Sequence, residues 1–358
     1  MTDTTGDRLT RAAAPMRLAV VGCGAVAERY HLPALIGRRD ITVTAVVDPT
    51  PARARAMASR LPGSVAMSDH RDLAGHVDAA LVTAPNAWHE SISVDLLRRG
   101  IHVLVEKPMA RSVDECDRMA AAAAASGCVL AVGHDFRHFP VAQFAAGFFA
   151  ERPLGPIRSV DVRQNAGMRW PAVSTGEISR EGGGGVLINF GVHVLDLLLW
   201  WLGDMRAVAY RDDAHGGVEA ECECELELQD GTPVRVDLTR RRPMRDTIIA
   251  TCERGTIELG MFEPAMIRLR VGGAGPVVEG TVPDLEFERA PLRTVFARQL
   301  ADFVAAIREG RAPLVPASDG RRVVALVSSC YARRQRLGRP WDFPQAFDTA
   351  AKGGQPDA

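Results

Sequence analysis

Short apolar segments alternate with helical patterns over the first 137 residues, and this alternation leaves few possible folds. The apolar segments are rich in β-branched residues, as is typical of strands buried on both faces of a parallel sheet. Parallel neighbours need a crossover between them, so the pattern predicts βαβ units and a doubly wound α/β sheet. The predicted strands are RLAVVG (17–22), ITVTAVVD (41–48), DAALVTAP (78–85), IHVLVEKP (101–108) and CVLAVGH (128–134).

From about residue 150 the predicted strands follow one another closely. They are joined by turns such as Asp230–Gly231, which predicts a mostly antiparallel sheet. One helix, at 186–202, interrupts the strands. Two more, at 293–309 and 319–336, close the chain, the second with Ser318 and Asp319 as its N-cap. The predicted strands are 157–165, 220–231, 232–240, 246–255, 256–261 and 266–273.

Composition excludes several classes of partner. The net charge of −1 gives no basic field, so we expect neither nucleic acid nor an anionic membrane as a partner. No apolar run reaches the ~18–20 residues of a membrane span, and residues 1–15 lack the apolar core of a signal peptide. The seven cysteines include no C-x-x-C pair, so we predict reduced thiols, a cytoplasmic protein and no metal site.

A glycine-rich turn follows the first predicted strand and opens a helix. Gly22, Gly24 and Ala27 form the G-x-G-x-x-A fingerprint of dinucleotide binding, in its βαβ context. The first glycine makes the tight turn, and the second lets the backbone approach a pyrophosphate. Asp48 ends the second strand, where its carboxylate suits ribose hydroxyls and repels a 2′-phosphate, so we predict NAD, with NADP as the second possibility. The alternative is a purely structural glycine turn.

Two later strands also end in polar or rigid residues, at the edge where ligands of an open α/β sheet collect. Asn86 and His89 follow the strand that ends at Pro85; the alternatives are a helix cap and a surface histidine. Only Lys107 and Lys352 are lysine among 43 Lys and Arg residues, and Lys107 follows a strand. A lysine there can stabilise a developing alkoxide. The predicted cofactor residues are Gly22, Cys23, Gly24, Ala25, Val26, Asp48, Ala84, Pro85, Asn86, His89, Glu106 and Lys107.

The helix predicted at 186–202 follows four glycines and carries a histidine. Asn189, His193 and Asp196 are spaced i, i+4 and i+7, which places them on one face of an α-helix. Such a histidine is suited to proton transfer. Asn189 can orient the ring of His193 by a hydrogen bond but supplies no charge. Asp196 can supply part of the negative charge that Asn189 lacks, or serve a structural role by binding the backbone or an arginine of the other domain.

These segments together resemble the glucose–fructose oxidoreductase / inositol dehydrogenase / rhizopine-catabolism (Gfo/Idh/MocA) family. The resemblance runs from residue 16 to about 345 and is carried by the motifs VVGCGAVAERYHLPAL, TAPNAWHE, VLVEKPMA, GHDFRHFP and GGGVLINFGVHVLDLLLWWLG. It implies an N-terminal Rossmann domain and a C-terminal α/β domain with an open, mainly antiparallel sheet. We therefore predict a disordered tail (1–15), an NAD(P)-binding domain (16–137), a substrate-binding and oligomerisation domain (138–345) and a polar tail (346–358).

The resemblance also assigns roles to residues. Lys107 matches a lysine that contacts substrate and nicotinamide, Pro108 a proline often preceded by a cis bond, and His193 the catalytic acid/base. Asn189 stands where the family has an aspartate, one helical turn before the histidine; we retain Asn189 as a catalytic-site residue that orients His193. The predicted substrate contacts in the cleft between the domains are Lys107, Arg137, Arg163, Arg169, Trp170, Asn189 and His193, although Arg163 and Trp170 can equally pack or face solvent.

The function implied is NAD(P)-dependent hydride transfer at a carbinol or ketone of a sugar, cyclitol or sugar derivative, in a homodimer or homotetramer. Lys107 and His193 would handle the proton. One alternative is an enzyme that uses bound NAD transiently for epimerisation, elimination or hydrolysis. Another is a non-catalytic NAD-binding sensor, against which the presence of Lys107 and His193 argues.

Overall fold

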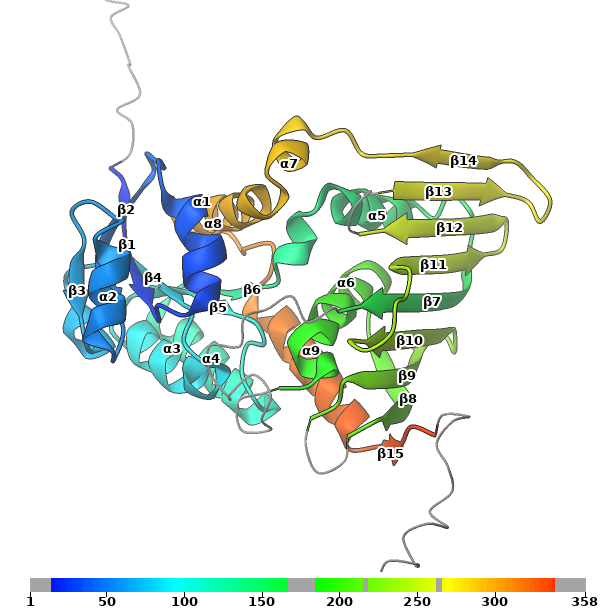
Figure 1. Cartoon of the computed structure of the whole chain (residues 1–358), viewed down its shortest axis with the longest axis horizontal. Helices are drawn as coiled ribbons and strands as arrows, with labels where there is room; N and C mark the ends of the chain where they lie inside the picture. Colours follow the sequence, from blue (N-terminus) through cyan, green and yellow to red (C-terminus); the bar gives the residue numbers. More distant parts are fainter. Residues whose placement is uncertain (1–13, 167–183, 215–217, 262–265, 339–358) are drawn as a thin grey trace, which may run out of the picture.

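The computed structural model describes residues 14–166, 184–214, 218–261 and 266–338 of the chain (Figure 1). Two sheets lie at opposite ends of the molecule, with helices between and around them. The predicted substrate residues Arg169 and Trp170 lie outside the described residues, as does almost all of both predicted tails.

The first sheet has six parallel strands in the order β3-β2-β1-β4-β5-β6. This confirms the doubly wound sheet predicted from the alternation of strands and helices. β3 was missed because its three residues carry too short an apolar pattern. The chain reverses its direction of winding between β1 and β4, which is where a dinucleotide binds in this topology. The strands are β1 (Met16–Val21), β2 (Ile41–Val47), β3 (Val65–Met67), β4 (Ala79–Val82), β5 (His102–Glu106) and β6 (Leu130–Gly133).

Helices connect these strands much as predicted. α4 has a local reason for each of its ends: the Ser112 side chain accepts a hydrogen bond from the Glu115 N–H, and Gly127 closes the helix with φ of 66°. Apolar side chains of α3 and α4 pack on one face of the sheet, in a core that also includes Val324 near the C-terminus. The helices are α1 (Leu32–Leu35), α2 (Pro51–Ala58), α3 (His89–Arg98) and α4 (Val113–Ser126).

The second sheet has nine strands in the order β14-β13-β12-β11-β7-β10-β9-β8-β15. Most neighbours are antiparallel, as predicted, but β7 runs parallel to β10 and β8 parallel to β15. Strand direction depends on which distant segment pairs with which, so local patterns do not reveal it. The strands are β7 (Ile157–Asn165), β8 (Met205–Asp212), β9 (Glu221–Leu228), β10 (Pro233–Thr239), β11 (Thr247–Cys252), β12 (Gly255–Gly260), β13 (Met266–Val271), β14 (Val277–Gly280) and β15 (Arg334–Arg336).

One face of this sheet is apolar and the other is polar. In β10, Val234, Val236 and Leu238 are buried in the core that also contains apolar residues of α5 (Pro140–Glu151) and α6 (Val192–Leu202). The alternating side chains of the outer face form cross-strand ion pairs, such as Arg211 with Glu225 at 2.7 Å. α5 was not predicted, because its side chains are apolar on nearly all sides of the helix and so show no amphipathic periodicity.

Two C-terminal helices return to the first sheet. α8 (Pro291–Glu309) follows the short α7 (Leu285–Arg289) and contacts α1. α9 (Ala317–Tyr331) packs against both α4 and α6, so it belongs to both halves of the fold. The predicted N-cap of α9 is wrong: Pro316 occupies the N-cap, and Asp319 already lies inside the helix. The domain boundaries at 137 and 138 stay a prediction.

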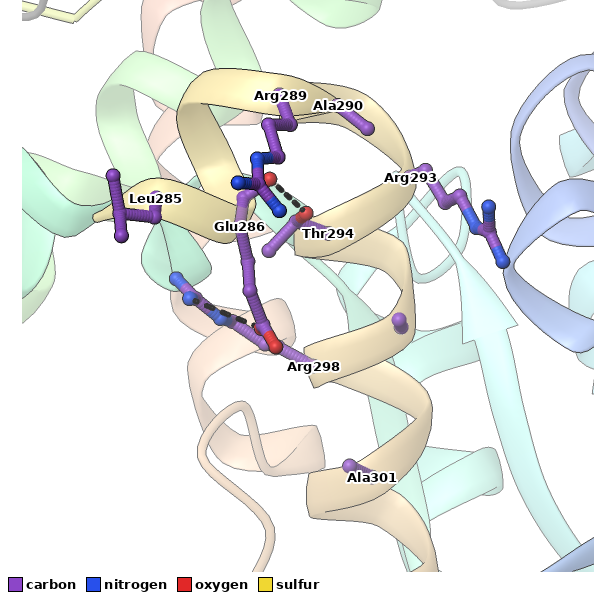
Figure 2. Close-up of a pocket in the computed structure, with 9 residues that line it drawn as sticks. Leu285, Glu286, Arg289, Ala290, Arg293, Thr294, Arg298 and Ala301 are labelled. Carbon is purple, nitrogen blue, oxygen red and sulfur yellow. Dashed lines mark hydrogen bonds and ion pairs between the residues drawn. The ribbon is translucent and has the colours of Figure 1, made fainter. Parts of the chain in front are cut away.

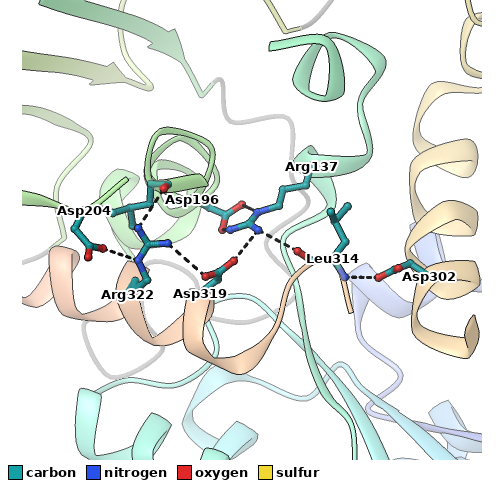
Figure 3. A network of polar contacts seen from close by, with 8 residues as sticks. Arg137, Asp196, Asp204, Asp302, Leu314, Asp319 and Arg322 are labelled. Carbon is teal, nitrogen blue, oxygen red and sulfur yellow. Dashed lines mark hydrogen bonds and ion pairs between the residues drawn. The ribbon is translucent and has the colours of Figure 1, made fainter. Parts of the chain in front are cut away.

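A buried ion-pair network joins the end of the first sheet to the helices of the second half (Figure 3). Arg137 donates to both carboxylate oxygens of Asp196 at 2.7 and 2.8 Å, and a third donor reaches Asp319 of α9 at 2.8 Å. The side chains of Arg137 and Asp196 are 1% and 0% exposed. The prediction that Arg137 contacts substrate is therefore not supported, because its guanidinium binds groups inside the protein. The structural reading of Asp196 is confirmed.

Replacing Asp196 by alanine is expected to lower the free energy of unfolding by about 3 kcal/mol, because it leaves the buried Arg137 charge only partly compensated. Urea unfolding followed by circular dichroism measures this. The matched control is Arg17→Met, which breaks an ion pair with Asp78 whose side chains are 46% and 42% exposed and should leave the midpoint nearly unchanged. Equal midpoint shifts in the two variants would contradict the prediction.

Candidate active site

The glycine turn at residues 22–24 has the geometry that its sequence predicts. Gly22 has φ of 101°, and a Cβ at this position would lie 2.6 Å from the Ala84 nitrogen. A Cβ on Gly24 would meet nothing within 4 Å. The first glycine is thus required by the packing of the turn against the end of β4, while the second leaves open space. This is the combination that a phosphate-binding turn needs.

Asp48 stabilises the glycine turn from the end of β2. One carboxylate oxygen accepts the Cys23 N–H at 2.9 Å, and the other accepts the Thr50 N–H at 2.8 Å. The side chain is buried. Since each carboxylate oxygen can accept more than one hydrogen bond, these contacts leave capacity for a ribose hydroxyl, and the predicted cofactor contact of Asp48 stays a prediction.

Residues at the end of β4 have two different roles. The ring nitrogens of His89 lie 2.9 Å from the Pro108 oxygen and 2.8 Å from the Ala84 oxygen. The side chain is fully enclosed, so His89 joins the ends of β4 and β5, and neither a surface position nor the predicted cofactor contact is supported. Asn86 is not the N-cap of the short turn that it begins, and its buried Oδ1 has no hydrogen-bond partner within the described residues. Such an orphaned acceptor fits a ligand donor.

The end of β5 carries a buried acid–histidine pair. Glu106 Oε1 lies 2.7 Å from His31 Nε2, and Oε2 accepts the Lys107 N–H. Burial alone would raise the pKa of Glu106, but the hydrogen bond with His31 and the charges of His31 and Lys107 outweigh it and hold the pKa below its ordinary value. The carboxylate serves the protein interior, so the predicted contact of this side chain with a cofactor is not supported.

Lys107 reaches from the end of β5 to the segment before α6. Its Nζ donates to the backbone oxygen of Asn189 at 2.7 Å. The peptide bond between Lys107 and Pro108 is cis, as the family resemblance implied. The two motifs that the sequence analysis assigned to proton handling, 82 residues apart in the chain, therefore meet in space.

The segment before α6 differs from the α-helix that the sequence predicts. Residues Leu187–Gly191 form a π-helical turn, and α6 proper begins at Val192. Gly185, with φ of 113°, lets the chain pass close to Glu219, whose carboxylate accepts the Leu187 N–H. The wider turn breaks the regular i, i+4 relation between Asn189 and His193. Of the described side chains, Asp135 lies beside His193 Nδ1, with its Oδ1 at 3.3 Å, so the assignment of Asn189 as the residue that orients His193 is not supported.

Asp135 and His193 have opposite pKa shifts. Burial, and then the nearby Glu106 carboxylate, raise the pKa of Asp135 to about 7. Burial, and then the positive charge of Lys107, lower the pKa of His193 well below its ordinary value. His193 is therefore a neutral imidazole at neutral pH and can accept a proton. Perturbed acid and base groups of this kind collect at functional sites.

The sequence analysis missed Asp135 and two other buried polar residues. His134 and Gln164 are enclosed, and within the described residues their ring nitrogens and amide atoms have no hydrogen-bond partner. His134 lies beside His193, with ring centroids 6.2 Å apart. Gln164 points to the buried side of β7, whereas the neighbouring Arg163 is exposed on the other side. This exposure agrees with the alternative that Arg163 faces solvent, and its predicted substrate contact is not supported.

A surface pocket lies apart from these residues, between α7 and the first half of α8 (Figure 2). Some of its polar side chains have partners within the protein. Arg298 forms an ion pair with Asp284 at 2.6 Å, and the Thr294 hydroxyl donates to the backbone oxygen of Glu286 at 2.9 Å. None of the predicted site residues lines it. Within the described ranges, no His, Cys, Asp and Glu cluster is arranged to hold a metal ion, and no helix has the length and apolarity needed to cross a bilayer.

Asp135→Asn is expected to become more stable relative to the wild type as pH rises from about 4 to 7. The folded pKa is raised, so between the two pKa values the unfolded Asp135 is ionised while the folded one keeps its proton, which costs the wild type stability. The predicted gain is on the order of 1–3 kcal/mol at pH 7. Urea unfolding at several pH values measures it, and a gain that is independent of pH would contradict it.

Comparisons with known proteins agree with the fold and identify the family. A family model described as "Oxidoreductase family, NAD-binding Rossmann fold" matches residues 16–134, and the "GFO/IDH/MocA C-terminal domain" model matches residues 145–258. A solved 3-ketoreductase from Actinomadura kijaniata, in complex with NADP and TDP-benzene, has the same fold with a TM-score of 0.79 at 23% identity. The match covers 91% of this chain and 100% of that one.

Two curated relatives show the range of the similarity. D-glucoside 3-dehydrogenase of Escherichia coli K12 is 30% identical over 53% of this chain, and the match spans only 54% of that protein. dTDP-3,4-didehydro-2,6-dideoxy-alpha-D-glucose 3-reductase of Streptomyces antibioticus is 28% identical over 82% of this chain and 89% of its own length. Since the two family models match in succession and together cover well over half of the chain, it belongs to the Gfo/Idh/MocA family of NAD(P)-dependent oxidoreductases.

Proposed function

We propose that this protein exchanges a hydride between a nicotinamide cofactor and a carbinol or ketone of a sugar or cyclitol, with Lys107 and His193 handling the proton. The observation that carries the proposal is the hydrogen bond from Lys107 Nζ to the Asn189 oxygen. It ties the end of β5 to the turn that leads into His193, so a lysine and a neutral histidine stand at one place in the fold. The sugar-modifying activities of the two relatives support the substrate class.

The residues at the strand ends fit a dinucleotide. Gly24 would lie along the pyrophosphate, Asp48 would accept hydrogen bonds from the adenosine ribose, and the orphaned Oδ1 of Asn86 would accept one from the cofactor. A bound nicotinamide supplies the hydride acceptor or donor. We propose NAD rather than NADP, because the Asp48 carboxylate would repel a 2′-phosphate.

Each of the two proton-handling residues has a distinct task. During oxidation His193, neutral and buried, accepts the proton of the substrate hydroxyl, since the shift in its pKa favours the uncharged base. Lys107 donates a hydrogen bond to the same oxygen and stabilises its developing negative charge. In the reverse direction the imidazolium returns the proton.

We also propose a homo-oligomer in the cytoplasm. The polar outer face of the nine-stranded sheet offers a broad surface to a second copy of the chain. The seven cysteines are unpaired, which suits a reducing compartment.

Lys107→Met and His193→Ala are each expected to lower kcat by about 100-fold or more, while the affinity for the cofactor changes little. A panel of polyols and keto-sugars with NAD(H) and NADP(H), followed at 340 nm, measures turnover; fluorescence titration measures cofactor binding. His76→Ala, which replaces an exposed histidine, is the matched control and should keep full turnover. Normal turnover in both site variants would refute the assignment.

Gly22→Ala and Gly24→Ala separate packing from cofactor binding. A Cβ at Gly22 collides with the backbone of Thr83 and Ala84, so Gly22→Ala should lose both stability and cofactor affinity. A Cβ at Gly24 meets no protein atom within 4 Å, so Gly24→Ala should keep the melting temperature of the wild type. The added methyl group would collide with the phosphates, so the variant should bind the cofactor at least about 10-fold more weakly. Unchanged cofactor binding in Gly24→Ala would contradict the proposed site.

A further inference from the structure

The short turn that follows β6, Asp135–His138, contacts both His193 and Asp196 of α6. Asp135, Phe136 and Arg137 follow one another at the end of β6. Asp135 Oδ1 lies 3.3 Å from His193 Nδ1, and the Phe136 ring stacks on the imidazole with centroids 4.2 Å apart and planes 17° apart. Arg137 forms its two-pronged ion pair with Asp196. The turn therefore contacts the edge and the face of the imidazole and is itself fastened to α6.

We propose that Asp135 is the positioning residue of His193, so that the catalytic imidazole takes its carboxylate partner from the β6 turn and not from its own helix. This rests on the proposed function of His193. Above its pKa of about 7, Asp135 is a carboxylate. This carboxylate keeps the proton of neutral His193 on Nδ1, leaves the Nε2 lone pair for the substrate hydroxyl, and stabilises the imidazolium that forms. The same arrangement of base and orienting carboxylate recurs in unrelated enzymes.

The contact is compatible with this role although the two atoms do not meet the geometry of a hydrogen bond. Catalytic hydrogen bonds are often long without substrate and tighten in the complex. Both side chains are less than a tenth exposed, so neither is held by bulk water. Nδ1 has no other hydrogen-bond partner within the described residues, and Asp135 is the carboxylate within reach.

The groups around the pair set its charge. Glu106 opposes ionisation of Asp135, and Lys107 and His134 oppose protonation of His193. Asp196 is already neutralised by Arg137 and is not the partner of the imidazole. An uncompensated imidazolium in this enclosed position would be costly, and the Asp135 carboxylate lowers that cost. The charged and titratable groups that act on the pair are Tyr30, Glu106, Lys107, His134 and Asp196. Arg137 acts on the neighbouring His134.

The proton balance is simple. The O–H bond of the substrate breaks and an N–H bond forms at His193 Nε2, while the Nδ1 proton stays hydrogen-bonded to Asp135. The imidazole becomes an imidazolium, and Asp135 remains a carboxylate. In the reduction direction the Nε2 proton passes to the substrate oxygen, and the imidazole returns to its neutral form.

The first test is the pH dependence of kcat/KM for oxidation in Asp135→Asn. Without the carboxylate His193 is a weaker base. The rise of kcat/KM with pH should therefore occur at lower pH, and the value of kcat/KM on the plateau should fall by about 100-fold. Cofactor affinity should remain that of the wild type. The matched control is Asp319→Asn, which removes a partly buried carboxylate that binds Arg137 and not His193; its pH profile should match the wild type.

The second test needs no substrate. Nitrogen-15 NMR of labelled histidine, with His193 assigned by its loss in His193→Gln, reports which ring nitrogen carries the proton. At a pH above the Asp135 pKa of about 7, we expect the Nδ1–H form in the wild type and in Asp135→Glu, and a shift toward the Nε2–H form in Asp135→Asn. Asn189→Ala should keep the wild-type form, because the Asn189 contact with Lys107 is made by the backbone oxygen.

The outcomes separate this proposal from the proposed function. If the wild type oxidises no compound in the panel but Asp135→Asn changes the protonated nitrogen, the proposed function fails and the pairing stands. If Asp135→Asn changes neither the protonated nitrogen nor the pH limb, or if Asp319→Asn moves the limb equally, the role of Asp135 is overturned. Recovery of the wild-type NMR signature in Asp135→Glu supports it.

Discussion

The arrangement of the site depends on the buried ion pair between Arg137 and Asp196. It joins residues 59 positions apart, on the last turn of the parallel sheet and on α6. Because both side chains are almost completely enclosed, breaking the pair would leave a charge in a medium that solvates it poorly. The pair therefore fixes the β6 turn against α6, and this in turn places Asp135 and Phe136 around His193. Asp319 of α9 shares the guanidinium and extends the same constraint to the C-terminal helix.

A second link approaches from the end of β5. The hydrogen bond of Lys107 with the Asn189 oxygen uses the backbone of the π-helical turn, so it depends on the shape of that turn and not on the identity of the side chain. Glu106, the preceding residue, is held by His31. The site thus consists of two acid–histidine pairs, Glu106 with His31 and Asp135 with His193, and a lysine whose charge acts on both. Burial opposes the charged form of each group, so it raises the pKa of Asp135 and lowers that of His193. Only for Glu106 do its partners, His31 and Lys107, outweigh burial and hold the pKa low.

Asn189 illustrates the limit of periodicity. The i, i+4 spacing predicts a contact with His193 if the segment is a regular α-helix, and the π-helical turn removes that regularity. His89 and Arg163 show the opposite error. Their residue types suit ligand contacts, but burial between two carbonyl oxygens and exposure on the outer sheet face assign them other roles. In each case a neighbour that is distant in sequence decides what the side chain contacts.

Features that arise within one strand–turn–helix unit could be predicted from the amino-acid sequence. Local patterns account for five of the six strands of the parallel sheet, for the conformation of Gly22, and for the positions of Asp48 and Lys107 at strand ends, because apolar periodicity and backbone sterics act over a few residues. β3 is too short to carry such a pattern. Three contacts could be found only from the folded chain: Arg137 neutralises Asp196, β7 and β10 run parallel, and Asp135 faces His193. These contacts join segments dozens of residues apart, and packing and charge compensation select them only after both halves of the chain have folded together.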